Sequence, residues 1–218
     1  IVRAALSRAR AKDERLAAVP YYDALAAEVA FAAGEPEDAL GHAERALAGL
    51  GRAETLATAR AMAIAAEAAR QQGDYARARK HYASAFQRDP GVFRRLELPL
   101  AVRIEIMGGE AAEELASMLE RSPRFVHEDD GLGLQVHVES LRARVCLTSD
   151  GGDLISCADT ESYAGEDPEV LAARAAADTF EQMFSPRIDL TQIDINSLDG
   201  GNLAGRGTLD TLFDTPGD

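Results

Sequence analysis

Two different patterns of apolar residues divide this chain. Up to residue 92, apolar residues recur at the three- and four-residue spacing of amphipathic helices, in segments rich in Ala, Leu and Arg. The breaks in this pattern predict short turns near Pro20, Gly34, 49–51, Gly73 and 90–91. From residue 96 onward, short segments of strand-like character alternate with helical ones. The pattern therefore predicts helical hairpins followed by a mixed α/β part.

The second part is expected to alternate strands with helices. Strands are predicted over about 96–106, 124–127 and 134–139, and helices over 110–121 and 168–184. An alternative is that residues 94–121 form another degenerate helical hairpin. Pro99 and the β-branched run around it argue against this alternative.

A β-hairpin is predicted over residues 141–161, where two apolar-rich runs flank a turn at 149–153. A two-residue turn at Gly151-Gly152 would set Cys146 opposite Cys157, whereas a longer turn would shift the register. These are the only two cysteines in the chain. The register favours a disulfide and an oxidising compartment. Against this, a two-residue turn places the cysteines at a hydrogen-bonded pair, where side chains are less close. The alternative is two ordinary buried thiols.

One segment of the helical half carries a family resemblance. The run Gly73–Ala78, followed by Tyr82, Ala85 and Pro90, resembles the second helix of a tetratricopeptide repeat (TPR). An earlier, degenerate copy begins at Gly34, which lies 39 residues upstream. The resemblance implies stacked helical hairpins over 1–92, with the aromatic ring of Tyr75 filling the elbow between two helices.

The same resemblance implies a groove lined by the first helix of each repeat. The positions that match the family's groove residues are Tyr21, Glu28, Phe31, Arg60, Glu67, Arg70 and Gln71, together with Ala24, Ala32 and Ala63. Such grooves bind peptides or partner segments, and Arg60 with Arg70 is expected to contact carboxylates. The alternatives are that these residues are solvated, or that the chain's own first helix fills the groove.

The order of elements over 96–188 resembles the α/β domain of bacterial envelope lipoproteins, such as the curli secretion channel family and penicillin-binding-protein activators. In those domains, too, a hairpin built around an Asp-x-x-Gly-type turn leads into a terminal helix. The resemblance implies a periplasmic or outer-membrane scaffold, with a possible lipid anchor upstream of Ile1 as its link to the membrane. The alternative is a cytoplasmic TPR adaptor or regulator with reduced cysteines.

Charge adds a constraint on partners. Residues 1–95 carry 15 Lys/Arg against 12 Asp/Glu, whereas residues 96–218 carry 8 against 25, within a net charge of −14. Such an acidic second half repels phosphate backbones, so nucleic acid is not an expected partner. The excess charge serves either solubility or a cationic partner, with divalent cations as a further option. An apolar content of 46% without a long apolar run predicts no transmembrane helix.

Motifs for catalysis are not found. The sequence contains no G-x-S-x-G, P-loop or dinucleotide fingerprint, so neither an enzyme nor a cofactor is expected. His127 to Asp130 with His137 could bind a metal, but acidic loops are usually solvated and no metal site is predicted. Residues 188–195 are expected to form a strand or an extended arm able to join another protein's sheet.

These observations predict an α + α/β protein with TPR-like hairpins over 1–92, an acidic α/β domain over 96–188, and an extended or disordered acidic tail over 189–218. The expected function is that of a non-enzymatic scaffold or assembly factor, which binds a protein or peptide partner within a larger assembly.

Overall fold

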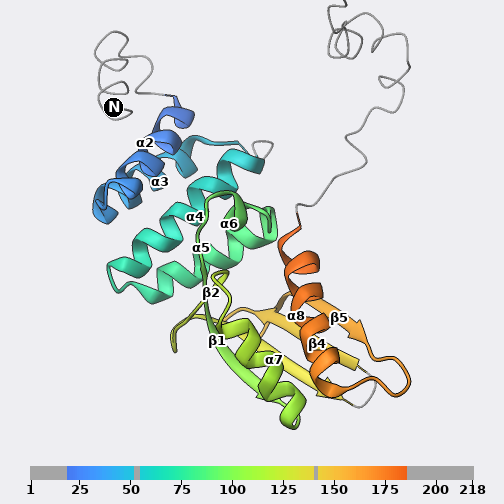
Figure 1. Ribbon diagram of the computed structural model, residues 1–218. Helices are drawn as coiled ribbons and strands as arrows, with labels where there is room; N and C mark the ends of the chain where they lie inside the picture. Colours follow the sequence, from blue (N-terminus) through green and yellow to red (C-terminus); the bar gives the residue numbers. More distant parts are fainter. Residues whose placement is uncertain (1–18, 52–54, 140–141, 186–218) are drawn as a thin grey trace, which may run out of the picture. The chain divides into compact units, whose positions relative to one another are not determined.

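The computed structural model describes residues 19–51, 55–139 and 142–185. Within these ranges, helical hairpins are followed by a five-stranded mixed sheet with two further helices (Figure 1). The order of elements confirms the α + α/β fold class and the antiparallel hairpin that the sequence predicts. The tail expected over 189–218, the arm expected over 188–195 and the helix expected before residue 19 lie outside the described residues.

Four helices form two hairpins. They are α2 (Pro20–Ala32), α3 (Pro36–Gly49), α4 (Thr55–Gln71) and α5 (Tyr75–Arg88). Proline occupies the first position of α2 and α3, where its missing N–H costs no helical hydrogen bond. Gly34 and Gly73 follow α2 and α4 with φ of 76° and 77°, a conformation that favours glycine and ends each helix. The turns predicted from these glycines are thus in place.

An aromatic cluster joins the helical half to the sheet. Phe86 of α5 contacts Phe93 of the short helix α6 (Val92–Arg95) and Phe184 near the end of the chain's last described helix. Phe184 also contacts Phe125 beside the sheet, with ring centroids 5.5 Å apart. These residues belong to one continuous buried core that extends from Ala27 to Phe184. The hairpins and the sheet therefore share a single core.

The sheet has the strand order β2-β1-β3-β4-β5. Its strands are β1 (Leu100–Met107), β2 (Phe125–His127), β3 (Leu132–Glu139), β4 (Arg142–Thr148) and β5 (Leu154–Glu161). Strand β1 runs parallel to β2 and β3, whereas β3, β4 and β5 are mutually antiparallel. Because β1 occupies 100–107, the alternative of a helical hairpin over 94–121 is wrong.

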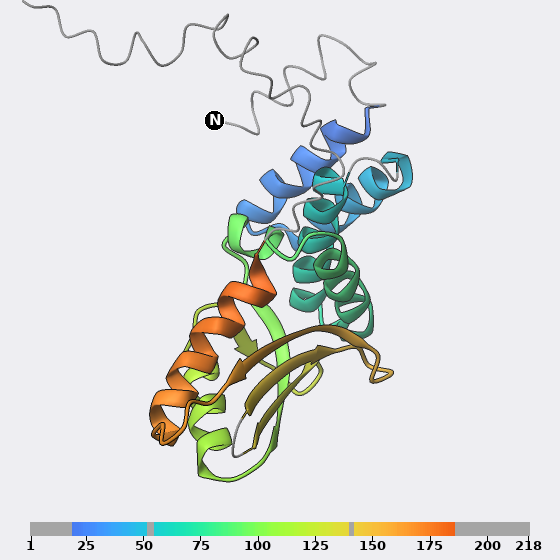
Figure 2. The same ribbon diagram turned by 90° about the vertical axis from the view of Figure 1, so that its right-hand side faces the viewer.

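Two helices cover one face of the sheet: α7 (Glu110–Glu120) and α8 (Pro168–Phe184) (Figure 2). Val136, Val145 and Ala158 are aligned across β3, β4 and β5 and are buried in the same core as Leu171 of α8. Successive strand residues point to opposite faces, so the neighbouring residue Arg144 lies on the other face and is exposed.

The β4–β5 turn differs from the predicted one. The N–H of Gly152 donates to the carbonyl of Ser149, and the N–H of Ser149 donates to the carbonyl of Asp153. Of the two turn glycines, only Gly152 has a positive φ, of 80°. The loop therefore has three residues and the geometry of a type I turn followed by a left-handed residue. The predicted two-residue primed turn is wrong.

A bulge restores the predicted register. Thr148 pairs with Leu154 but Leu147 pairs with Ser156, so one residue of β5 is left unpaired. This extra residue cancels the shift introduced by the longer turn, and Cys146 faces Cys157. The two cysteines form a disulfide with Cα atoms 4.2 Å apart, which matches the closely spaced type of cross-strand pair rather than the hydrogen-bonded type.

Candidate functional site: an acidic pocket between two helices

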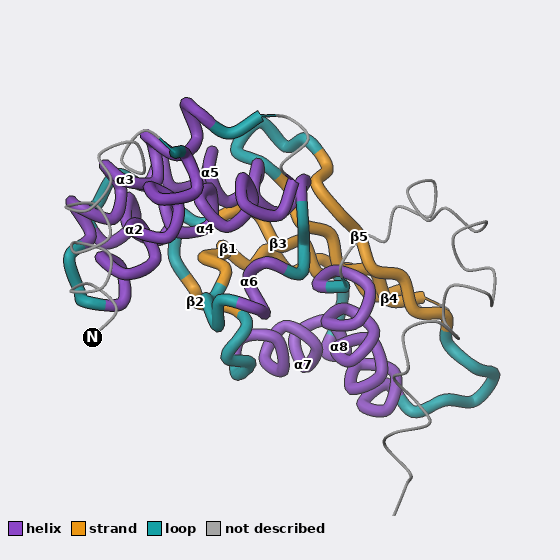
Figure 3. The backbone as a smooth tube through the Cα atoms, turned by 90° about the horizontal axis from the view of Figure 1, so that it is seen from above, coloured by secondary structure: helices purple, strands orange, loops and turns teal. Residues whose placement is uncertain are grey.

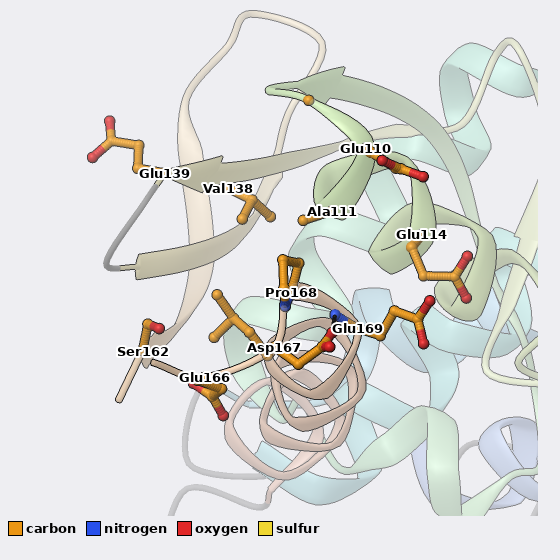
Figure 4. Close-up of a pocket in the computed structure, with 12 residues that line it drawn as sticks. Glu110, Ala111, Glu114, Val138, Glu139, Ser162, Glu166, Asp167, Pro168 and Glu169 are labelled. Carbon is orange, nitrogen blue, oxygen red and sulfur yellow. Dashed lines mark hydrogen bonds between the residues drawn. The ribbon is translucent and has the colours of Figure 1, made fainter. Parts of the chain in front are cut away.

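A pocket of about 500 Å³ lies between the first turns of α7 and α8 and the end of β3 (Figure 4). We call it the acidic pocket. Its lining residues are Gly109, Glu110, Ala111, Glu114, Val138, Glu139, Ser162, Glu166, Asp167, Pro168, Glu169 and Leu171. Six of these twelve residues carry carboxylates, and none carries a positive charge or an imidazole.

The fold places this pocket where the chain leaves the sheet. Strand β1 ends at Met107, and Gly108-Gly109 lead into α7. Gly108 has a φ of 139°, and a Cβ there would lie 2.8 Å from the carbonyl oxygen of Val138. Glycine is therefore required for α7 to begin this close to β3. In open α/β sheets, ligands commonly bind at this position, beyond the carboxyl ends of parallel strands.

The opposite wall comes from the segment between β5 and α8. Asp167 caps α8 by accepting a hydrogen bond from the N–H of Glu169 at 2.9 Å. Arg174 donates to Glu166 at 2.8 Å, and its guanidinium lies 4.4 Å from the centroid of the Tyr163 ring. The hydrogen bond from Arg174 is the main reason why the pKa of Glu166 lies below its usual value. Glu166 is thus an ionised residue of this wall whose charge Arg174 compensates.

The other carboxylates are less well compensated. Glu114 lies 3.7 Å from Arg121, and Glu139 lies 3.6 Å from His137. Among the described residues, Glu110 and Glu169 have no cationic partner. Figure 4 shows the side chains of Glu114 and Glu169 extending to the same side of the pocket, whereas Glu139 points away from it.

Apolar residues form most of the remaining lining. Ala111, Val138, Pro168 and Leu171 lie between the two acidic walls. A site of this kind attracts a positive charge and accommodates the methylene groups that carry it. Within the described residues, no group of three His, Cys, Asp or Glu side chains is arranged to hold a metal ion.

The residues predicted to line the TPR-like groove are largely engaged within the chain. Arg60 donates twice to Glu28, at 2.7 and 2.5 Å, which links α4 to α2. Its pKa is raised, chiefly by this hydrogen bond. Tyr21 is 48% exposed and Phe31 is half-buried, so this end of the predicted groove retains an accessible aromatic surface.

At the other hairpin, two of the predicted groove residues are buried. Ala63 is fully buried and Glu67 is only 3% exposed. Glu67 accepts hydrogen bonds from Arg70 at 2.9 Å and from the hydroxyl of Tyr82 at 2.5 Å. Gln71 is exposed and donates weakly to Glu67 at 3.4 Å. Arg70 also pairs with Glu128 in the loop before β3, so its charge already has two carboxylate partners.

Burial and hydrogen bonding act in opposite directions on Glu67. Burial alone raises its pKa, but the hydrogen bonds from Arg70 and Tyr82, together with the charge of Arg70, outweigh burial and lower it. The pKa of Tyr82 is raised, first by burial and then by the adjacent negative charge. The TPR resemblance implies a groove position for Glu67, whereas the structure places it in a buried network between the hairpins and the sheet.

Tyr75 is placed differently from expectation, and the histidines that were considered as metal ligands lie apart. Tyr75 does not fill the helical elbow, since it is 38% exposed and lines a second pocket of about 350 Å³ with residues 127–130. His127 pairs with Val102 and His137 with Met107, five positions apart along β1. The structure therefore does not bring these histidines together.

No helix within the described ranges is both long and apolar enough to cross a bilayer. The chain matches no protein-family model, and neither the curated proteins nor the solved structures give a significant match.

Proposed function

We propose that this chain is a non-enzymatic interaction scaffold whose acidic pocket binds a cationic segment of a partner protein. The observation that carries the proposal is the lining of the pocket, which includes six carboxylate residues and four apolar ones but no lysine or arginine. The excess negative charge of residues 96–218 points in the same direction.

Helix-end electrostatics explain only part of this charge. Acidic residues are favourable in the first turn of a helix, which accounts for Glu110 in α7 and Glu169 in α8. It does not account for Glu114, which lies a full turn further along α7. A lysine or arginine side chain of a partner would compensate these carboxylates, and its methylene groups would cover Val138 and Leu171.

The helical hairpins supply a second contact surface in this proposal. Their support is the resemblance of residues 73–90 to a TPR helix and the two hairpins formed by α2 to α5. The open end of the predicted groove, with Tyr21 and Phe31, fits an apolar side chain of a partner better than a carboxylate. Arg60 at that end is already paired with Glu28.

For the cellular location, we propose the bacterial envelope, in the periplasm or as part of a lipoprotein assembly at the outer membrane. The disulfide between Cys146 and Cys157 supports an oxidising compartment. The envelope and lipoprotein parts of this proposal rest on the resemblance of residues 96–188.

Neutralising the pocket should weaken its capture of cations. The test compares the full chain with the double variant Glu114→Gln and Glu169→Gln, using a synthetic hexa-arginine peptide as the probe. We expect the Kd at low salt to rise by about tenfold, because two charges close to the ligand are lost. Isothermal titration at two salt concentrations measures the effect.

The matched control removes two carboxylates from the first turn of another helix, with Glu37→Gln and Asp38→Asn in α3. At the higher of the two salt concentrations, this control should leave the Kd within about twofold of the original value, since exposed charges beyond a Debye length are screened. Equal weakening by both double variants would show that the peptide responds to net charge alone, and the pocket proposal would then be wrong.

A further inference from the structure

We propose that the Cys146–Cys157 disulfide is a redox-responsive cross-link between strands β4 and β5. Thiol reductants open it while the protein is folded, and its opening increases the mobility of residues 154–167. This inference concerns the sheet itself and holds whatever ligand the acidic pocket binds.

The disulfide lies on the sheet face that α7 and α8 leave uncovered. Side chains alternate along β4, so Cys146 shares a face with Arg142 and Arg144, whose side chains are 47% and 45% exposed. Cys146 itself is 8% exposed, and its partner Cys157 is half-buried. A thiol reductant can therefore approach the sulfur of Cys157 from this face without separation of the helices from the sheet.

Strand β5 is the edge strand, held by backbone pairing with β4, by two ion pairs from β4 to Asp159 and by contacts with α8. It pairs with β4 on one side only. On its open side, the side-chain amide of Gln182 accepts from the N–H of Asp159 at 3.1 Å and donates to the carbonyl of Asp159 at 3.2 Å. Thr160 donates to Asp178 of α8 at 2.6 Å. The disulfide is the one covalent cross-link between β5 and its neighbouring strand.

One end of β5 leads to an ion pair with the helical hairpins, and the other end leads to the wall of the acidic pocket. Its first residues follow the turn at 149–153, where Asp150 pairs with Arg79 of α5. Its last residue, Glu161, precedes Ser162, Glu166 and Asp167, which line the acidic pocket. Loss of the cross-link in the middle of the strand therefore affects the pocket wall and the contact with the helical hairpins.

The exchange reaction balances with a dithiol as reductant. One thiolate of the dithiol attacks Sγ of Cys157, the S–S bond breaks, and Cys146 leaves as a thiolate that takes up a proton from water. The second thiol of the reductant then attacks the mixed disulfide and releases Cys157. Two electrons pass to the protein, and the dithiol becomes a cyclic disulfide.

The test uses the full chain in native buffer with dithiothreitol. Free thiols are counted by alkylation and mass spectrometry over time, and hydrogen exchange is followed in parallel. We expect reduction of the folded protein within about tenfold of the rate measured in denaturant, because the bond is accessible. We further expect exchange of residues 154–167 to accelerate by at least roughly tenfold, while exchange in α4 stays unchanged.

A double variant, Cys146→Ser with Cys157→Ser, serves as the control. It should show the fast exchange of residues 154–167 with or without reductant. Reduction that proceeds only at the rate of global unfolding would identify a purely structural bridge and overturn the proposal. The proposal also fails if the bond is reduced in the folded protein and exchange in β5 does not change.

Discussion

Replacing Phe184 by alanine should lower the free energy of unfolding by about 3–5 kcal/mol, the usual cost of removing a fully buried phenylalanine. Phe184 is 2% exposed. Its ring contacts Phe86 of α5 and Phe125 of β2, with centroids 5.6 and 5.5 Å away. The cavity left by the substitution would therefore lie between the hairpins and the sheet, where neither half can close it alone.

The shared core also predicts that the hairpins and the sheet unfold cooperatively. Urea unfolding of the Phe184→Ala variant, followed by far-ultraviolet circular dichroism and by hydrogen exchange, should show α5 and β1 losing structure in the same transition. Val170→Ala on the exposed side of the same helix is the control, and it should cost less than about 0.5 kcal/mol. Unfolding of the sheet while the hairpins stay folded would contradict a common core.

Removing the charge of Glu67 should produce the second large effect. Glu67→Gln preserves the shape of the side chain but leaves Arg70 with one carboxylate partner, Glu128, and weakens the acceptor of the Tyr82 hydroxyl. We expect a loss of about 3 kcal/mol in the free energy of unfolding, as for other buried ion pairs from which one partner is removed. Urea denaturation at neutral pH measures this difference.

Glu44 offers a matched comparison, because it pairs with Arg77 on the surface of the same helical hairpins. Both side chains of that pair are about 40% exposed, at 40% and 39%. Glu44→Gln should therefore cost less than about 1 kcal/mol. A similar loss for Glu44→Gln and Glu67→Gln would show that burial of the Glu67 network adds nothing to stability.

The same network predicts a pH dependence. The pKa of Glu67 is lower in the folded chain than its ordinary value of 4.5, so its carboxylate binds a proton more readily when the chain unfolds. The stability that Glu67 contributes is therefore complete above about pH 4.5 and is lost as the pH falls through the lower folded value. The difference in unfolding free energy between the original chain and Glu67→Gln should shrink in that acidic range. A difference that stays constant through it would contradict the lowered pKa.

The sequence located most elements because their signals are local. Pro20 and the glycines at 34 and 73 mark helix ends by conformations that their own backbones impose. Alternation along residues 134–139 predicted most of β3, and Pro168 predicted the start of α8. The facing cysteines were also predicted, although by a different turn, because the bulge in β5 compensated for the extra residue in the loop.

The candidate site could not be found in the same way. Its walls come from α7, from the end of β3 and from residues 162–171, which no spacing in the sequence brings together. The TPR resemblance placed Glu67 and Arg70 in a groove. In the structure, Glu128 of the loop before β3 pairs with Arg70, so both residues belong to an internal network. The only local hint of the pocket was the excess of acidic residues after residue 96.

The sequence by itself determined the type and order of most helices and strands, that one half is acidic, and that the two cysteines belong to one hairpin. Each of these properties depends on neighbouring residues or on composition. The tertiary structure alone decided that Phe86, Phe125 and Phe184 form one core, and which carboxylates are buried or gathered around a pocket. Those contacts join residues far apart in the chain, and only packing of the hairpins against the sheet brings them within reach.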